Sequence, residues 1–119
     1  MKKREAEFTT TFLAWARNNI VPPAVFEIKS TRGKSVFYMR ELSKHQRDAL
    51  TAASKGCFSY KISDSGIGYK PFDALLLGNM PAYVVVSFPK HWYMIPIEQM
   101  PARGALHEEQ AEALCSVCG

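Results

Sequence analysis

The segment Ala24–Ser30, which directly follows two prolines, constrains the fold more than any other part of the chain. It is dominated by β-branched and aromatic residues, and the prolines prevent a helix from running into it, so we predict a strand. Side chains alternate between the two faces of a strand. Phe26 and Ile28 therefore share one face, and Glu27 and Lys29 share the other.

The pair Glu27 and Lys29 allows two interpretations. A carboxylate and an ammonium group on a half-exposed strand can simply form an ion pair, which contributes little to stability. The same groups on a rigid strand also suit phosphodiester hydrolysis, because a carboxylate binds a divalent cation and a lysine polarises water or steadies the phosphate. The motif alone favours the simple ion pair, so the rest of the chain has to decide.

The composition indicates one globular domain. The chain has 119 residues, of which 47% are hydrophobic and 22% charged, which is enough for a core of its own. The net charge of +4 suggests a polyanionic partner, although ordinary proteins also carry such a charge. No apolar run has the length of a membrane span, and acidic residues follow the basic start Met1–Arg4, so we expect a cytosolic protein without a membrane partner.

The first helix is predicted over residues 4–18, where Phe8, Phe12 and Trp15 recur at helical spacing. Glu5 extends this apolar stripe at its N-terminal end, and Glu7 lies near the edge of the stripe. An acidic residue at this place is either a first-turn charge that the helix dipole favours or a site residue aimed at the sheet. Both interpretations stay open for both glutamates.

A second helix is predicted to open at Ser43 and to end near Gly56. Ser43 and Gln46 have the spacing of a capping box. Gln46 therefore has two candidate roles: it can cap the helix start, or it can reach across to the strand with Glu27 and Lys29. We expect that it cannot do both fully in one rotamer, and the spacing favours the cap.

Further strands are predicted at residues 35–39, 58–62, 72–77, 82–88 and 91–97. Apart from Asp73, the strand 72–77 is apolar on both faces, so we predict a buried central strand. A carboxylate in such a strand is costly unless it is paired or bound to a metal. Asp73 is either a metal ligand or a residue at a strand start that binds local backbone amides.

The turns and the C-terminal segment carry the remaining candidates. Residues 31–34 read as a hairpin turn with Arg32 and Lys34 at its tip, and the loop 63–71 offers Tyr69 and Lys70 for contacts with nucleic acid. Residues 98–119 read as a linker, a short acidic helix and a C-x-x-C pair, which is half of a zinc site to which His107 could add a ligand. We expect this segment to be loosely attached.

Five short pieces occur together in one order: EAEF at 5–8, FEIKS at 26–30, HQRDAL at 45–50, YKISD at 60–64 and KPFDA at 70–74. With these pieces the chain resembles the Holliday junction resolvase-like nucleases of the PD-(D/E)xK superfamily, which include the archaeal resolvases and the bacterial recombination-protein-U family. It looks most like the short phage and prophage recombinases of this group. The resemblance spans residues 5 to about 97, and several pieces in one order are far more specific than E-x-K alone.

The resemblance implies an α/β fold of the restriction-endonuclease type, with a central mixed sheet flanked by two helices in residues 1–97 and a C-terminal tail in 98–119. It implies a Mg²⁺-dependent endonuclease, with Mn²⁺ as a possible substitute, that acts on branched or duplex DNA as a homodimer inside a bacterial or phage-infected cell. Glu27 would bind metal, Lys29 would be the catalytic lysine, Gln46 would support the site, and Glu5 or Glu7 would join them. Contacts with DNA would come from Lys2, Lys3, Arg4, Arg32, Lys34, Lys44, Tyr69 and Lys70.

The chain departs from the superfamily at the metal-binding aspartate, which normally precedes the E-x-K motif. No aspartate lies upstream of Glu27. We therefore expect the strand 72–77 to pair directly with the strand 24–30, so that one divalent ion can bridge Asp73 and Glu27, with Asp64 as the replacement candidate. If this is wrong, the site lacks a ligand. Another nuclease of the same fold, or a non-catalytic DNA-binding or recombination-accessory protein, is the alternative.

Overall fold

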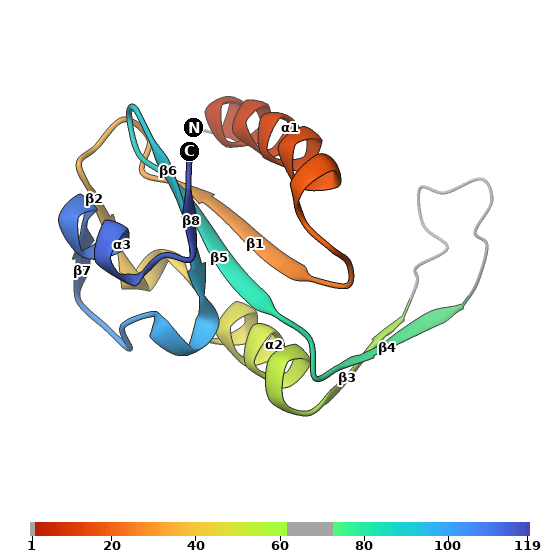
Figure 1. The fold of residues 1–119 in the computed structure, drawn as a ribbon. Coiled ribbons are helices and arrows are strands. Elements are labelled where there is room, and N and C mark those ends of the chain that lie inside the picture. Colours follow the sequence, from red (N-terminus) through yellow and green to blue (C-terminus); the bar gives the residue numbers. More distant parts are fainter. Residues whose placement is uncertain (1, 62–72) are drawn as a thin grey trace.

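The computed structural model describes residues 2–61 and 73–119 (Figure 1). The helices are α1 (Lys2–Asn19), α2 (Lys44–Lys55) and α3 (Glu108–Leu114), with short 3-10 turns at Met39–Glu41 and Ile97–Gln99. The strands are β1 (Val25–Ser30), β2 (Val36–Tyr38), β3 (Cys57–Lys61), β4 (Ala74–Gly78), β5 (Ala82–Ser87), β6 (Trp92–Pro96), β7 (Ala105–His107) and β8 (Val117–Cys118). In this described part, no helix is both long enough and apolar enough to cross a membrane.

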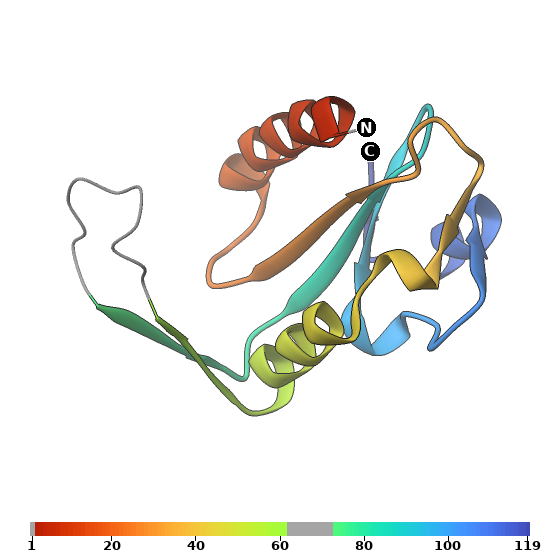
Figure 2. The ribbon, with the colours of Figure 1, turned by 180° about the vertical axis from the view of Figure 1, so that it is seen from behind.

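A mixed four-stranded sheet in the order β1-β5-β6-β8 forms the centre of the molecule. β1 runs parallel to β5, with Glu27 opposite Val84 and Lys29 opposite Val86, and the other neighbours in the sheet are antiparallel. α1 covers one face of this sheet and α2 lies on the other (Figures 1 and 2). The predicted α/β class with a central mixed sheet and a helix on each side is confirmed at this level.

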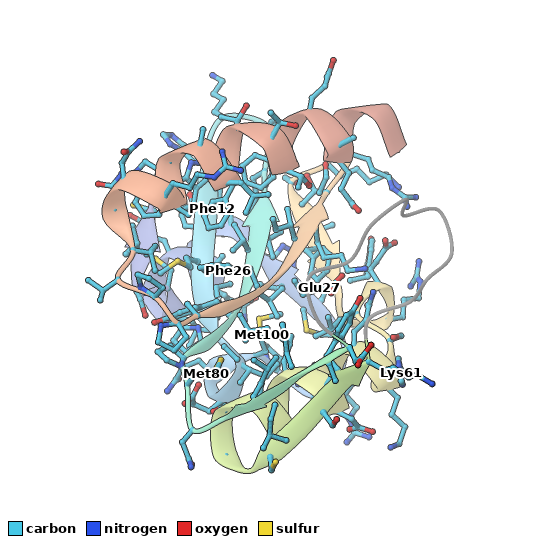
Figure 3. The ribbon with its side chains drawn as sticks, turned by 90° about the vertical axis from the view of Figure 1, so that its right-hand side faces the viewer. Phe12, Phe26, Glu27, Lys61, Met80 and Met100 are labelled. Atoms are coloured by element: carbon cyan, nitrogen blue, oxygen red, sulfur yellow. The ribbon has the colours of Figure 1, made fainter. Side chains whose placement is uncertain are left out.

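The face under α1 is closed by aromatic side chains, as the helical spacing predicts. Phe12 is fully buried, and its ring meets that of Phe26 edge to face at a centroid distance of 5.1 Å (Figure 3). The ring of Trp92 meets Phe12 in the same way at 5.2 Å. Ile28 packs against the same cluster. Because Phe26 and Ile28 point toward α1, the alternation along β1 turns Glu27 and Lys29 toward α2.

The opposite face holds the larger core, and the C-terminal residues are part of it. Val84 and Val86 of β5 pack there together with Leu50 of α2. Leu106 of β7 and Ala111 of α3 are fully buried in the same cluster. β7 pairs with β2, and β8 pairs with β6. The expectation that residues 98–119 are loosely attached is therefore wrong, because their apolar side chains complete the core and their backbone extends the sheets.

β3 and β4 form a separate two-stranded antiparallel sheet that projects from the body (Figures 1 and 2). Tyr60 is opposite Leu75 in this hairpin, and the exposed fractions of Tyr60, Leu75 and Leu76 are 53%, 40% and 75%. Two predictions are thus wrong: residues 73–77, the described part of the segment 72–77, are not in a buried central strand, and β4 does not pair with β1. β5 takes that place, since Val84, Val85 and Val86 fill both faces of the sheet.

The turn after β1 has the left-handed backbone typical of a tight turn, but the two strands that it connects do not pair with each other. Arg32 and Gly33 both adopt the left-handed conformation, with φ of 61° and 87°. The strands on either side do not form a hairpin, because β1 belongs to the central sheet and β2 pairs with β7. The predicted hairpin at residues 31–34 is therefore wrong, although the turn itself is present.

Candidate functional site

The centre of the candidate site is the pair Glu27 and Lys29 on β1. Lys29 Nζ lies 3.6 Å from Glu27 Oε2, and the exposed fractions of the two side chains are 15% and 30%. This arrangement confirms the predicted common face. Since water reaches the pair only partly, the two charges interact more strongly than a fully solvated pair would.

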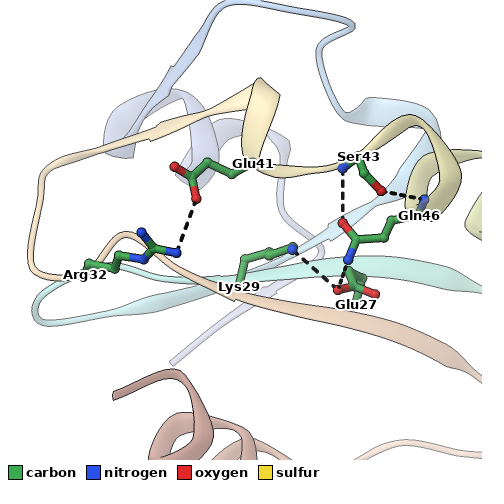
Figure 4. Close-up of polar contacts among 6 residues, drawn as sticks. All are labelled: Glu27, Lys29, Arg32, Glu41, Ser43 and Gln46. Atoms are coloured by element: carbon green, nitrogen blue, oxygen red, sulfur yellow. Dashed lines mark hydrogen bonds and ion pairs between the residues drawn. The ribbon is translucent and has the colours of Figure 1, made fainter. Parts of the chain in front are cut away.

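Gln46 connects this pair to the start of α2. Its Oε1 accepts a hydrogen bond of 3.0 Å from the backbone N–H of Ser43, and its own backbone N–H donates to Ser43 Oγ at 3.0 Å. At the same time, Gln46 Nε2 donates to Glu27 Oε2 at 3.0 Å (Figure 4). The expectation that Gln46 must choose between the cap and the site is wrong, because its amide accepts at one end and donates at the other.

The orientation of the Gln46 amide follows from this network. A flipped amide would place Oε1 against the Glu27 carboxylate and Nε2 against the N–H of Ser43, so that both contacts would become repulsive. Glu27 Oε2 therefore receives two donors, the amide of Gln46 and the ammonium of Lys29.

Within the described residues, the other acidic candidates do not join Glu27 in a group of three metal-ligating side chains. Glu5 and Glu7 belong to α1, which packs on the face of Phe26 and Ile28, opposite the face toward which Glu27 points. Asp73 immediately precedes β4, whose partner is β3 and not β1. Asp64 lies outside the described residues. Within the residues that the structure describes, no three Asp, Glu, His or Cys side chains lie close enough together to hold a metal ion.

The predicted DNA-contacting residues fall into three groups. Arg32 and Lys34 are exposed in the turn after β1, and Arg32 Nη2 lies 3.9 Å from Glu41 Oε1. Lys44 in the first turn of α2 pairs with Asp48 at 2.7 Å, a hydrogen bond that raises the pKa of Lys44. Tyr69 and Lys70, and the side chains of Lys2, Lys3 and Arg4, lie outside what the structure describes.

Three arginines near the start of α2 were missed by the sequence analysis. Arg40, Arg47 and Arg103 line one cavity together with Lys44. Arg40 stands over the ring of Tyr38 at 4.5 Å. Arg47 follows Lys44 by three residues in α2, so its position beside Lys44 on one face of the helix could have been inferred. Arg103 lies in a segment without periodicity, and nothing local places it at the helix start.

The thiols near the C-terminus do not form a zinc site within the described residues. Cys115 and Cys118 are both free, and they belong to no group of three metal-ligating side chains in this part of the chain. Burial raises the pKa of the Cys115 thiol. The backbone N–H of His107 donates to Gln110 Oε1 at 2.9 Å at the start of α3. These residues therefore contribute to the local structure of the C-terminal segment.

A matched pair of substitutions tests the contact between Gln46 and Glu27 separately from the cap oxygen of Ser43. Gln46→Glu keeps an oxygen for the N–H of Ser43 but places a second carboxylate against Glu27, which raises the pKa of one of them. The raised carboxyl is neutral in acid and ionises at higher pH, so we expect a deficit in the free energy of unfolding that is small at pH 4.5 and grows to about 1–3 kcal/mol at pH 7.5. Urea unfolding at both pH values measures it.

Ser43→Ala is the control for this prediction. It removes the cap oxygen and leaves the contact between Gln46 and Glu27 in place. We expect a loss of about 0.5–2 kcal/mol that is the same at both pH values. A Gln46→Glu protein whose deficit does not grow with pH would contradict the contact between Gln46 and Glu27.

Comparisons with known proteins do not place the chain in a family. No family model matches the sequence. No curated protein and no solved structure matches it either.

Proposed function

We propose that this protein is a Mg²⁺-dependent endonuclease that cleaves DNA at four-way or other branched junctions, with Glu27, Lys29 and Gln46 in its active site. The observation that carries the proposal is the arrangement of these three residues. A carboxylate and a lysine share one face of a strand at 3.6 Å, and a helix glutamine holds the carboxylate at 3.0 Å. The resemblance of the chain to the resolvase-like nucleases assigns roles to these same three positions.

The chemistry divides among these residues. Lys29 would steady the negative charge on the phosphate or polarise the attacking water, because its ammonium group is held at the site by Glu27. Gln46 would fix the rotamer of Glu27. When bound, Mg²⁺ would neutralise charge on the phosphate oxygens and lower the pKa of a bound water, with Glu27 as one oxygen ligand.

The described residues are compatible with a metal site of the open kind. Mg²⁺ keeps several waters and is commonly held by one or two carboxylates together with phosphate oxygens of the substrate. Glu27 is a single, partly exposed carboxylate that could fill one such position. Among residues 2–61 and 73–119, Glu27 belongs to no group of three ligating side chains, so waters and phosphate oxygens of the substrate would fill most of the remaining positions.

The finer fold and the oligomeric state belong to the same proposal. A mixed sheet with α1 on one face and α2 on the other, and the E-x-K motif on the strand that starts the sheet order, supports a restriction-endonuclease-like fold. The resemblance also implies a homodimer. Sedimentation velocity of the purified protein would determine its mass in solution.

A non-catalytic DNA-binding or recombination-accessory protein is the second candidate. It is favoured by one observation, which is that Glu27 belongs to no group of three metal-ligating side chains among the described residues. Such a protein would bind DNA through the same predicted DNA-contacting residues without cutting it.

A cleavage assay separates the two candidates. Labelled four-way junction and linear duplex of the same sequence are incubated with the protein, once with Mg²⁺ and once with chelator, and resolved on a denaturing gel. Cleavage of the junction in Mg²⁺, with little cleavage of the duplex and none with chelator, supports the nuclease. Binding of either DNA without any cut strand in Mg²⁺ favours the accessory protein.

The charges in the turn after β1 give a prediction for binding. We expect that replacing Arg32 and Lys34 together by glutamate weakens DNA binding across sequences and lowers the slope of log K against log salt by about 2, since each contact with a phosphate releases about one counterion. Fluorescence anisotropy over a salt series measures both. Arg17→Glu with Lys55→Glu changes the net charge equally on exposed residues elsewhere. An equal loss in this control would attribute the effect to net charge alone.

A further inference from the structure

A cavity of about 710 Å³ lies beside the first turn of α2, between the 3-10 turn Met39–Glu41 and the residues that lead into β7. Among the residues that the structure describes, four cationic ones line it, namely Arg40, Lys44, Arg47 and Arg103, and no acidic one does. An opening of this size is within the usual range of ligand sites. Its charge makes it complementary to an anion.

Two of these four cations bind other groups of the protein, and the other two are available to a ligand. Arg47 Nη2 donates to the carbonyl of Pro101 at 2.6 Å, and Lys44 pairs with Asp48 at 2.7 Å. Arg40 lies over the ring of Tyr38, and within the described part of the chain neither Arg40 nor Arg103 forms an ion pair or a side-chain hydrogen bond. In the described part of the chain, Arg40 and Arg103 therefore face the large cavity with no carboxylate paired to them.

The cationic lining continues past Arg40 into a second, smaller cavity. This cavity of about 50 Å³ is lined by three cations, Arg32, Lys34 and Arg40, by one carboxylate, Glu41, which lies 3.9 Å from Arg32, and by Thr31. Thr31 is only 5% exposed, and its Oγ1 has no hydrogen-bond partner among the described residues. A buried hydroxyl without a partner is costly, and it is satisfied when a polar group enters the space beside it.

The large cavity is also joined to the candidate active site. Ser43 lines the cavity and donates its N–H to Gln46, whose amide holds Glu27. The two sites thus meet at the first turn of α2. A polymer that carries a phosphate at regular intervals can occupy both places at once, whereas a small anion would leave most of a 710 Å³ cavity empty.

We propose that this cavity binds a backbone segment of DNA next to the phosphate at Glu27 and Lys29, with Arg40 and Arg103 contacting the phosphate of that segment. The identity of the ligand rests on the proposed function, whereas the anion site itself rests on the cavity and its charges. The site directs the strand from Lys29 across the start of α2, and it accounts for arginines that the candidate active site does not use.

The test measures binding without cleavage. A fluorescein-labelled four-way DNA junction is titrated with the full chain in chelator over a series of salt concentrations. In Arg40→Gln with Arg103→Gln, we expect an affinity at least about tenfold lower than that of the original protein and a salt slope lower by about 2. Arg17→Gln with Lys55→Gln removes the same net charge from exposed positions outside the cavity, and we expect a change in affinity below about threefold.

Two further variants keep the result interpretable. Arg40→Lys with Arg103→Lys retains both charges, and we expect it to retain most of the salt slope. Arg103→Gln alone changes an exposed side chain without an ion pair in the described structure, so a folding defect cannot explain its effect, and we expect about half of the change in slope. Equal losses in the cavity variant and the control variant, or an unchanged slope in Arg103→Gln, would overturn the proposal.

The failure of this proposal can be distinguished from the failure of the proposed function. A protein that binds the junction with the expected slopes but cuts nothing in Mg²⁺ keeps the cavity as a DNA site and loses the nuclease. A protein that cuts with unchanged binding in the cavity variants keeps the nuclease and loses the cavity. A protein that binds no DNA at low salt overturns the cavity as a DNA site.

Discussion

Lys29→Met is expected to lower the rate of DNA cleavage at least about a hundredfold, which is typical for the loss of a group that stabilises charge or transfers a proton in the transition state. Methionine has a similar length and fills the partly buried position, since the Lys29 side chain is only 15% exposed. Gln46 continues to donate to Glu27 in this variant. The loss should therefore concern the chemical step, with little change in fold.

Single-turnover cleavage of a four-way junction at saturating protein measures this effect, and anisotropy in chelator measures binding. Lys55→Met is the matched control, because Lys55 is exposed at the end of α2 and lies outside the pair with Glu27. We expect the control to cut at nearly the original rate. Normal cleavage by Lys29→Met would remove lysine from the mechanism.

Leu106→Ala is expected to lower the free energy of unfolding by about 2–5 kcal/mol, because Leu106 is fully buried between β2, β7 and the main core. This is a large part of the stability of a typical domain, which is about 5–15 kcal/mol. Urea unfolding followed by tryptophan fluorescence measures it, since Trp15 and Trp92 lie on the other face of the sheet. A lower free energy of unfolding reported by these tryptophans would show that the C-terminal segment unfolds together with the whole domain.

Leu76→Ala is the control with the same chemical change. Leu76 is 75% exposed in the hairpin, so its truncation should change the free energy of unfolding by no more than about 0.5 kcal/mol. Similar effects of the two substitutions would contradict the burial of Leu106 and return the C-terminal segment to a loosely attached tail.

The local elements could be predicted because their signals are local. Two prolines before a β-branched run predict β1, the alternation along β1 predicts the common face of Glu27 and Lys29, and the spacing of Phe8, Phe12 and Trp15 predicts α1. Each of these signals depends on backbone geometry over a few residues. They do not depend on which other strand lies alongside.

The strand partners could not be predicted in this way. The segment 72–77 and β5 are both rich in apolar residues, but only Val84, Val85 and Val86 pack against helices on both faces of the sheet. The expected position of Asp73 beside Glu27 follows only from the need for a metal ligand, which is a requirement of the expected chemistry and not of the chain. β7 has only three residues, which is too short for a periodic signal, so the burial of Leu106 was not visible.

Within the site, the prediction for Gln46 was wrong because of the chemistry of its amide group. Gln46 was treated as a side chain with one hydrogen-bonding direction, whereas its amide has an acceptor and a donor that point apart. The cavity arginines were missed for another reason. Arg40 and Arg103 come from segments 63 residues apart in sequence, and only the packing of the C-terminal segment brings them together.

Because Gln46 both caps α2 and supports Glu27, local opening at the start of α2 also removes the support of the carboxylate. Helix ends open more readily than the rest of a fold, and such opening takes far less free energy than global unfolding. When the first turn of α2 frays, the N–H of Ser43 loses its acceptor, and the same movement draws the amide of Gln46 away from Glu27. The exchange rate of one backbone hydrogen, that of Ser43, therefore reports how often the carboxylate is released from its support.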